Sequence, residues 1–157
     1  MKALLRALAR VFMRVCFPSV RQLPTAQLAD WLADPSRPQP LLLDVRQPEE
    51  FAVSHLAGAR RVDFGSDASA VLADSPPAQP IVCYCAAGFR SSAMARRLAR
   101  VGRKEVFNLE GAIFDWASEA RPLLCKDGVT REVHPFNWIG GLMLAQEVRA
   151  RVPSLRH

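Results

Sequence analysis

Short runs of apolar residues recur along this chain at the spacing expected of strands in an α/β protein. The clearest runs cover residues 41–45, 81–85 and 105–109, and weaker ones cover 20–23 and 61–62. Runs of this length are typical of buried strands, and helical or irregular segments separate them. This alternation predicts a parallel sheet sandwiched between helices, with a functional site at the carboxyl ends of the strands.

A basic amphipathic helix is predicted over residues 1–17, before Pro18 ends it. Its basic residues recur at every fourth position: Lys2, Arg6, Arg10 and Arg14. Because these cations interrupt every apolar run, the helix cannot span a bilayer. Three roles fit it: an anchor on a membrane surface, a mitochondrial presequence if the source is eukaryotic, or a helix packed on the domain's flank or on a partner.

The sequence divides into residues 1–19, a central domain over 20–124 and a C-terminal extension over 125–157. In the extension, Asp127-Gly128 predicts a turn, and Asn137 is placed to cap a helix over 138–151. The apolar stripe of that helix favours packing over the domain, with self-association or membrane contact as alternatives.

The net charge of +6 is concentrated at the two ends of the 157-residue chain. Residues 1–21 hold five basic and no acidic residues, whereas residues 22–128 hold 12 basic and 13 acidic residues. The central domain therefore lacks the basic patch of a nucleic-acid-binding protein, and we expect no nucleic-acid partner.

The four cysteines, Cys16, Cys83, Cys85 and Cys125, indicate reduced thiols in a cytoplasmic protein rather than a disulfide framework. Their spacing matches no zinc motif, so neither a metal nor another cofactor is expected. Cys83 is interpreted as a small buried hydrophobe. Cys125 is a weaker candidate for a resolving thiol, and His55 is a candidate general base.

The candidate reactive group is Cys85, at the predicted carboxyl end of the strand over 81–85. Gly88 permits a sharp turn after it, and Ser91-Ser92 supply side-chain oxygens suited to a helix start. Unpaired N–H groups at that helix N-terminus would favour a thiolate over a thiol. The loop therefore predicts an anion-stabilised nucleophile.

The six residues from Cys85 to Arg90 resemble the active-site loop of the rhodanese family of sulfurtransferases. Three further motifs extend the resemblance over roughly residues 20–124: Asp44-Val45-Arg46 followed by Pro48-Glu49-Glu50-Phe51, then His55-Leu56-Ala57-Gly58-Ala59, then Val106-Phe107-Asn108-Leu109-Glu110-Gly111 with Trp116. Three departures from the family pattern are expected to lie away from the loop: Ser54, Asp63 and Ala112.

The resemblance implies ping-pong sulfur transfer through a persulfide on Cys85, from a small sulfur-containing anion or persulfide donor to a thiol or protein acceptor. Backbone N–H groups of Ala86, Ala87, Gly88, Phe89, Arg90 and Ser91 would hold the sulfur. Arg90 would brace the loop, and Phe89 would shape its entrance. Asp44 and Arg46 are expected to organise the sheet edge. The resemblance also implies that His55 is a turn residue remote from the thiolate rather than a general base.

Two alternatives accompany this interpretation. The first is a sulfur-carrier or docking module that its terminal helices recruit to a membrane, through residues 1–17, or to a protein. The second is a phosphatase or arsenate reductase, which the loop disfavours because phosphatases of rhodanese fold use one residue more.

Overall fold

The computed structural model describes residues 2–151, so residue 1 and residues 152–157 of the predicted terminal segments lie outside it. Five parallel strands form the main sheet in the order β1-β5-β4-β2-β3. Their bounds are β1 Arg21–Leu23, β2 Leu41–Asp44, β3 Arg60–Arg61, β4 Ile81–Tyr84 and β5 Val106–Leu109. The predicted parallel α/β fold is confirmed, and the strand that precedes Cys85 lies at the centre of the sheet.

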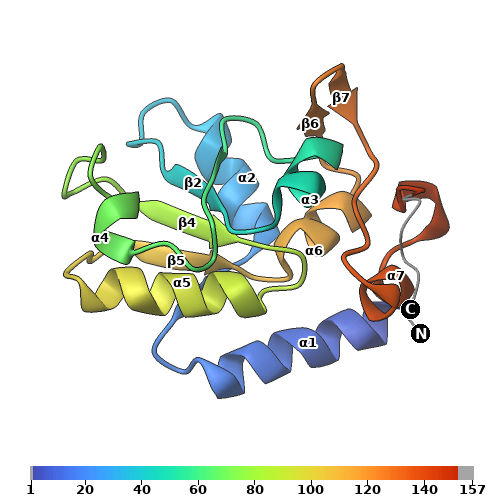
Figure 1. Cartoon of the computed structure of the whole chain (residues 1–157), viewed down its shortest axis with the longest axis horizontal. Coiled ribbons are helices and arrows are strands. Elements are labelled where there is room, and N and C mark those ends of the chain that lie inside the picture. The colour runs from blue at the N-terminus through green and yellow to red at the C-terminus, as the bar shows by residue number, and fades with distance from the viewer. Residues whose placement is uncertain (1, 152–157) are drawn as a thin grey trace.

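Helices cover both faces of the sheet (Figure 1). One face packs against α2 (Thr25–Ala33) and α6 (Ala112–Ser118), and the other against α4 (Ala68–Val71) and α5 (Phe89–Arg100). Side chains alternate between the two cores along β4, since Val82 and Tyr84 belong to the first and Ile81 and Cys83 to the second.

The remaining elements lie around the carboxyl edge of the sheet. They are α3 (Pro48–Val53), the hairpin β6 (Leu123–Cys125) and β7 (Gly128–Thr130), α7 (Trp138–Met143) and a single 3₁₀ turn, η1 (Gln146–Val148). The turn predicted at Asp127-Gly128 joins β6 to β7, and the side chain of Asn137 accepts a hydrogen bond from the N–H of Gly140, as expected of a helix cap.

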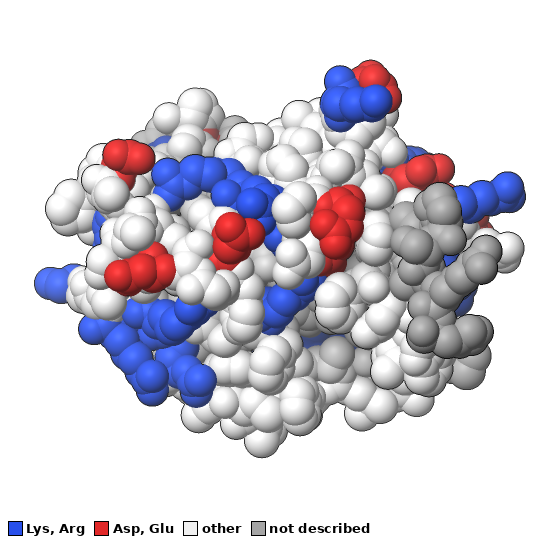
Figure 2. Space-filling model, in the orientation of Figure 1, with Lys and Arg blue, Asp and Glu red and all other residues white. Residues whose placement is uncertain are grey.

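The N-terminal helix, α1 (Lys2–Cys16), packs on the domain through a mixed side, on which Leu5, Ala9 and Met13 contact the core beside Arg6 and Arg10. Arg6 and Arg10 contact the carboxylate of Asp115 in α6 at 2.9 and 2.5 Å, and Arg14 pairs with Glu110 at 2.7 Å. The opposite side of α1 is apolar and faces outward, along the lower edge of Figure 2, where few charges lie. The helix therefore exposes its larger apolar side, whereas a surface helix usually exposes its charged side.

At the start of α2 the hydroxyl of Thr25 donates to Glu119. Two predicted helix boundaries were wrong. The helix after Cys85 begins at Phe89, two residues before the serines, because Gly88 adopts a left-handed conformation with a φ of 116°. The helix predicted over 138–151 ends at Met143, since the chain beyond it becomes extended and exchanges hydrogen bonds with Val133.

Candidate active site

The centre of the candidate site is the sulfur of Cys85, directly after β4 and only 2 % exposed. The chain turns at Gly88, and the N–H of Gly88 donates to Cys85 Sγ at 3.1 Å. The helix α5 starts at the next residue, so its first turn lies beside the sulfur. A backbone donor and a helix N-terminus thus both favour negative charge at this sulfur.

The loop is fixed from the opposite side by α6. The carbonyl oxygens of Cys85 and Ala86 accept hydrogen bonds from the N–H groups of Ile113 and Phe114, each at 3.2 Å. These donors belong to the first turn of α6, where backbone N–H groups have no partner within the helix. The two carbonyl dipoles are therefore directed toward α6, and the peptide groups after Cys85 are held in one orientation.

Ala112 lies next to this loop rather than away from it. It precedes Ile113 and has a φ of 52°, in the left-handed region that favours glycine. The expectation that this departure from the family pattern is remote from Cys85 was wrong, because the turn that carries it also supplies a donor to the loop. The other two departures, Ser54 and Asp63, lie after α3 and after β3.

A buried polar network approaches Cys85 from β5. Ser91 Oγ lies 3.4 Å from Cys85 Sγ and 2.6 Å from the side-chain oxygen of Asn108. The side-chain amide of Asn108 in turn donates to Gln22 in β1 at 2.7 Å. A hydroxyl has one proton, so Ser91 can donate it to Asn108, to the sulfur or to the carbonyl oxygen of Gly88, which lies 3.2 Å away. Asn108 therefore positions Ser91 beside the nucleophile.

Arg90 is held by Glu50 rather than pointing freely at the sulfur. Two hydrogen bonds of 2.8 and 2.9 Å join the guanidinium to the carboxylate. Burial alone would lower the pKa of Arg90, but the hydrogen bond to Glu50 and the nearby Cys85 raise it overall. Burial alone would raise the pKa of Glu50, yet the bonds from Arg90 and from the Gln47 N–H lower it. Both groups are therefore charged at neutral pH.

Terminal segments cover the loop on two sides. Met13 of α1 lies against Gly88, and Phe17 packs edge-on against Phe89 with ring centroids 5.4 Å apart. Phe136, from the C-terminal extension, stacks on the Arg90 guanidinium at 4.4 Å. Phe89 is 52 % exposed, which fits a residue at the entrance to the loop.

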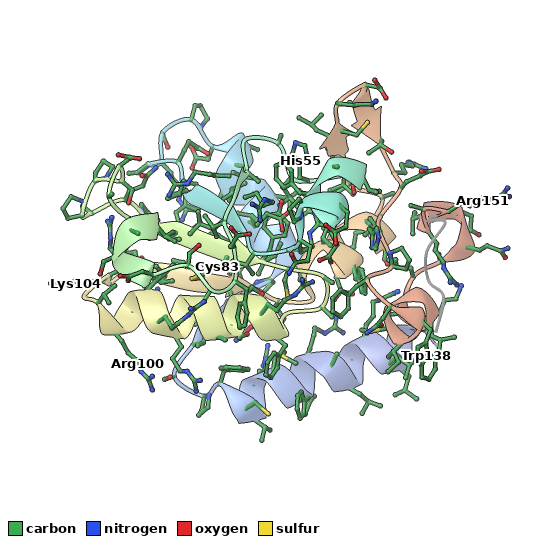
Figure 3. All side chains as sticks on the ribbon, in the orientation of Figure 1. His55, Cys83, Arg100, Lys104, Trp138 and Arg151 are labelled. Carbon is green, nitrogen blue, oxygen red and sulfur yellow. The ribbon has the colours of Figure 1, made fainter. Side chains whose placement is uncertain are left out.

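The other singled-out residues have structural environments. Cys83 is completely buried, and burial raises the pKa of its thiol well above the ordinary range. His55 stacks on Phe51 and contacts its carbonyl oxygen at 3.0 Å, beside α3 in Figure 3. Asp44 and Arg46 form a fully buried, two-bonded ion pair at the end of β2, which confirms their predicted structural role.

Sequence reasoning assigned no role to two side chains near the loop, Glu50 and Asn108. Asn108 could have been recognised from the sequence, because it is a polar residue inside an otherwise apolar strand. Glu50 is visible as the third residue of a helix with Gln47 as its cap. Within residues 2–151, no cluster of three or more His, Cys, Asp or Glu side chains is arranged to hold a metal ion.

Comparison with known proteins shows which protein family this sequence matches. Residues 26–119, more than half of the chain, match the model of the Rhodanese-like domain. The thiosulfate sulfurtransferase GlpE of Pseudomonas aeruginosa is 34 % identical over 77 residues, which are 49 % of this chain and 69 % of that protein.

A second relative is larger. The probable adenylyltransferase/sulfurtransferase MoeZ of Mycobacterium tuberculosis is 32 % identical over 97 residues, which are 61 % of this chain but 24 % of that protein. The chain thus spans about a quarter of the length of this relative.

Among solved structures, a thiosulfate sulfurtransferase from Pseudomonas aeruginosa superposes with a TM-score of 0.64 at 18 % identity, covering 85 % of this chain and 25 % of that one. At this identity the likeness concerns the fold.

Proposed function

This chain belongs to the Rhodanese-like domain family, and on that premise we propose that it transfers sulfane sulfur through a persulfide on Cys85. The family match and the sulfurtransferase relatives support sulfur transfer in general. The observation that carries the specific proposal is the contact of 3.1 Å between the Gly88 N–H and Cys85 Sγ, at the start of α5.

The first half-reaction is a nucleophilic displacement at sulfur. The Cys85 thiolate attacks the outer sulfur of a donor such as thiosulfate, a bond forms between the two sulfur atoms, and the bond within thiosulfate breaks. The electron pair of the broken bond leaves with sulfite. The product is a cysteine persulfide, whose terminal sulfur is anionic and can use the same donors as the thiolate did.

The second half-reaction returns the enzyme to its starting state. A thiolate or cyanide attacks the terminal sulfur, and the electron pair of the persulfide bond returns to Cys85 Sγ. No net oxidation of the protein takes place. The Ser91 hydroxyl can turn from Asn108 to the sulfur as negative charge returns to Sγ, because its oxygen lies 3.4 Å from Sγ.

The surroundings of the loop favour a small donor. Cys85 is 2 % exposed, and Met13, Phe17 and Phe89 stand on one side of its loop. A compact anion such as thiosulfate needs less space there than a large acyl or aryl ester would. The phosphatase alternative is still disfavoured, since phosphate needs a wider ring of backbone amides than the loop from Cys85 to Arg90 provides.

A second candidate function is a sulfur carrier that docks on another surface. The outward apolar side of α1 favours it, because that side has no counterpart within the domain. In this case turnover of thiosulfate would be incidental, and delivery of the persulfide to a docked partner would be the biological step.

Intact mass spectrometry after brief exposure to thiosulfate, without reductant, tests the sulfur chemistry. We expect wild type to gain one sulfur, about 32 Da, and to lose it on addition of cyanide. Cys85→Ser should gain none, whereas the matched control Cys125→Ser should behave as wild type. A gain of the same mass by Cys85→Ser would overturn the proposal, and so would a wild type that takes up no sulfur from thiosulfate or from a persulfide donor.

A further inference from the structure

The outward side of α1 carries five large apolar side chains on one helical face. These residues are between 54 % and 73 % exposed: Leu4, Leu8, Val11, Phe12 and Val15. They fall at helical spacing within the 15 residues of α1. Arg6 and Arg10 of the same helix pair with Asp115, and Leu5, Ala9 and Met13 beside them pack against the core. Arg14, which is itself 62 % exposed, pairs with Glu110. Ion pairs and apolar contacts thus together hold α1 in an orientation that leaves its larger apolar side exposed.

The short helix α7 extends this surface. Its exposed residues are Trp138, Ile139 and Leu142, with exposed fractions of 69 %, 52 % and 46 %. Arg6 of α1 donates to the carbonyl oxygen of Met143 at 3.0 Å, so the two helices lie side by side. We call the five residues of α1 and these three of α7 the apolar face. An exposed apolar surface built from two elements marks an interaction site more often than single exposed residues do.

A groove lined with basic residues lies beside the C-terminal end of α1. It has a volume of about 300 Å³, and the side chains of Arg21, Arg96, Arg100 and Lys104 line it without any acidic residue. Arg21 is paired with Glu105, but within residues 2–151 the other three cations form no ion pair. The Nε atom of Arg96 is buried and has no hydrogen-bond partner among those residues.

The basic groove and the apolar face share one edge of the molecule. Arg96 stacks over Phe17, directly after α1, at 4.9 Å. Figure 3 shows Arg100 at the lower left and Trp138 at the lower right, with α1 between them. In Figure 2, basic side chains gather at the lower left, and the rest of the lower edge is uncharged. Apolar and cationic groups are thus presented together toward one side.

We propose that this edge docks onto the surface of an anionic phospholipid bilayer, with α1 lying in the plane of the interface. The apolar face would enter the boundary between headgroups and acyl chains, and the groove would receive a lipid phosphate. Trp138 is a residue type that favours this boundary. Within residues 2–151, no helix is long and apolar enough to cross a membrane.

Charge complementarity favours a lipid surface over a second copy of the chain. Two copies meeting through this edge would bring the cations of their grooves to one interface, with no acidic residue lining either groove. A helix at the outer edge of the molecule is also a ridge, which a fluid bilayer accommodates without a matching groove (Figure 1). The inference is independent of the sulfur chemistry at Cys85.

Flotation of the full chain with vesicles tests the proposal. We expect recovery with vesicles of phosphatidylcholine containing phosphatidylglycerol to exceed recovery with phosphatidylcholine alone by at least about tenfold at low salt. The double variant L4Q/L8Q should lose this recovery, whereas V129Q, at an exposed apolar position on β7, should retain it. Circular dichroism and Tm would show that both variants fold.

The basic groove has its own matched pair of variants. R100Q/K104Q should lower recovery with anionic vesicles, whereas K126Q/R131Q, which removes the same charge from exposed positions elsewhere, should change it much less. Equal losses in the two pairs would overturn the role of the groove. Absence of wild-type recovery on anionic vesicles would overturn the proposal, and so would a dimer in sedimentation velocity that L4Q/L8Q converts to a monomer.

Discussion

Glu50 in α3 and Arg90 in α5 form a two-bonded ion pair although 40 residues separate them along the chain. The carboxylate is almost completely buried, and the guanidinium is mostly so. The pair ties the first turn of α5 to the opposite side of the candidate site. The backbone donor from Gly88, the start of α5 and the nearby Arg90, whose pKa Cys85 helps to raise, all favour negative charge at Cys85 Sγ.

Replacing Glu50 by Gln should loosen the loop. One charged hydrogen bond is lost and Arg90 becomes an unpaired, largely buried cation, so we expect a loss of about 1.5–3 kcal/mol in the free energy of unfolding. Sulfur uptake from thiosulfate should slow as well. Urea unfolding and uptake kinetics measure both effects, with Glu49→Gln at the exposed neighbouring position as control. Equal behaviour of the two variants would contradict the bracing role.

The same pair predicts how stability depends on pH. The folded protein lowers the pKa of Glu50 from its ordinary value of 4.5, so the stabilisation is complete above that value and is lost as the pH falls through the lowered pKa. The difference in unfolding free energy between wild type and Glu50→Gln should therefore be constant near neutral pH and shrink below about pH 4.5. A difference that grows on acidification would show the opposite linkage.

Two adjacent buried serines offer a test of the polar network. Ser91→Ala removes the hydroxyl beside Cys85 Sγ and leaves the Asn108 oxygen without that partner, so sulfur uptake should slow and stability should fall by about 1–3 kcal/mol. Ser92→Ala removes a buried hydroxyl that has no partner within the described residues, and it should cost little. Uptake kinetics and thermal unfolding of the two variants would be compared, and a Ser92 variant as slow as the Ser91 variant would rule out a specific role for Ser91.

Gly88 combines backbone strain with a close neighbour, and the two effects can be separated. Gly88 has a φ of 116°, and a Cβ added there would lie 3.3 Å from Met13. Gly128 has a similar φ of 117°, but a Cβ added there would meet open space. Gly128→Ala should show the cost of strain alone. Gly88→Ala should add slower sulfur uptake and looser packing of α1, measured as faster proteolysis of residues 2–16. Identical effects of both substitutions would show that α1 does not depend on this contact.

The strand pattern and the nucleophile were predictable because both rest on local sequence. The apolar run over 81–84 makes β4, and Cys85 follows it. The orientation of α1 was not predictable, since its larger apolar side would normally be buried and the acidic partners of its arginines, Glu110 and Asp115, lie about 100 residues away. Periodicity along a helix identifies its two sides and leaves open which one faces the domain.

The C-terminal extension shows the same limit. The apolar stripe predicted one helix over 138–151, yet the hydrogen bonds that Val133 exchanges with the chain near residue 149 draw it into an extended path. The Ser91–Asn108 contact likewise joins two elements that only the assembled sheet brings together. Each of these features depends on pairing across the fold, where local preference has little influence.

The salt bridge from Arg10 to Asp115 closes a chain segment in which the partners are 105 positions apart. Closing so long a segment reduces the conformational entropy of the chain before the contact can stabilise it. We therefore expect α1 to dock late in folding, after α6 has formed. During synthesis, α1 emerges from the ribosome well before Glu110 and Asp115, so its arginines have no acidic partner until those residues emerge. Pulsed hydrogen exchange during refolding should accordingly protect the amides of β4 before those of α1.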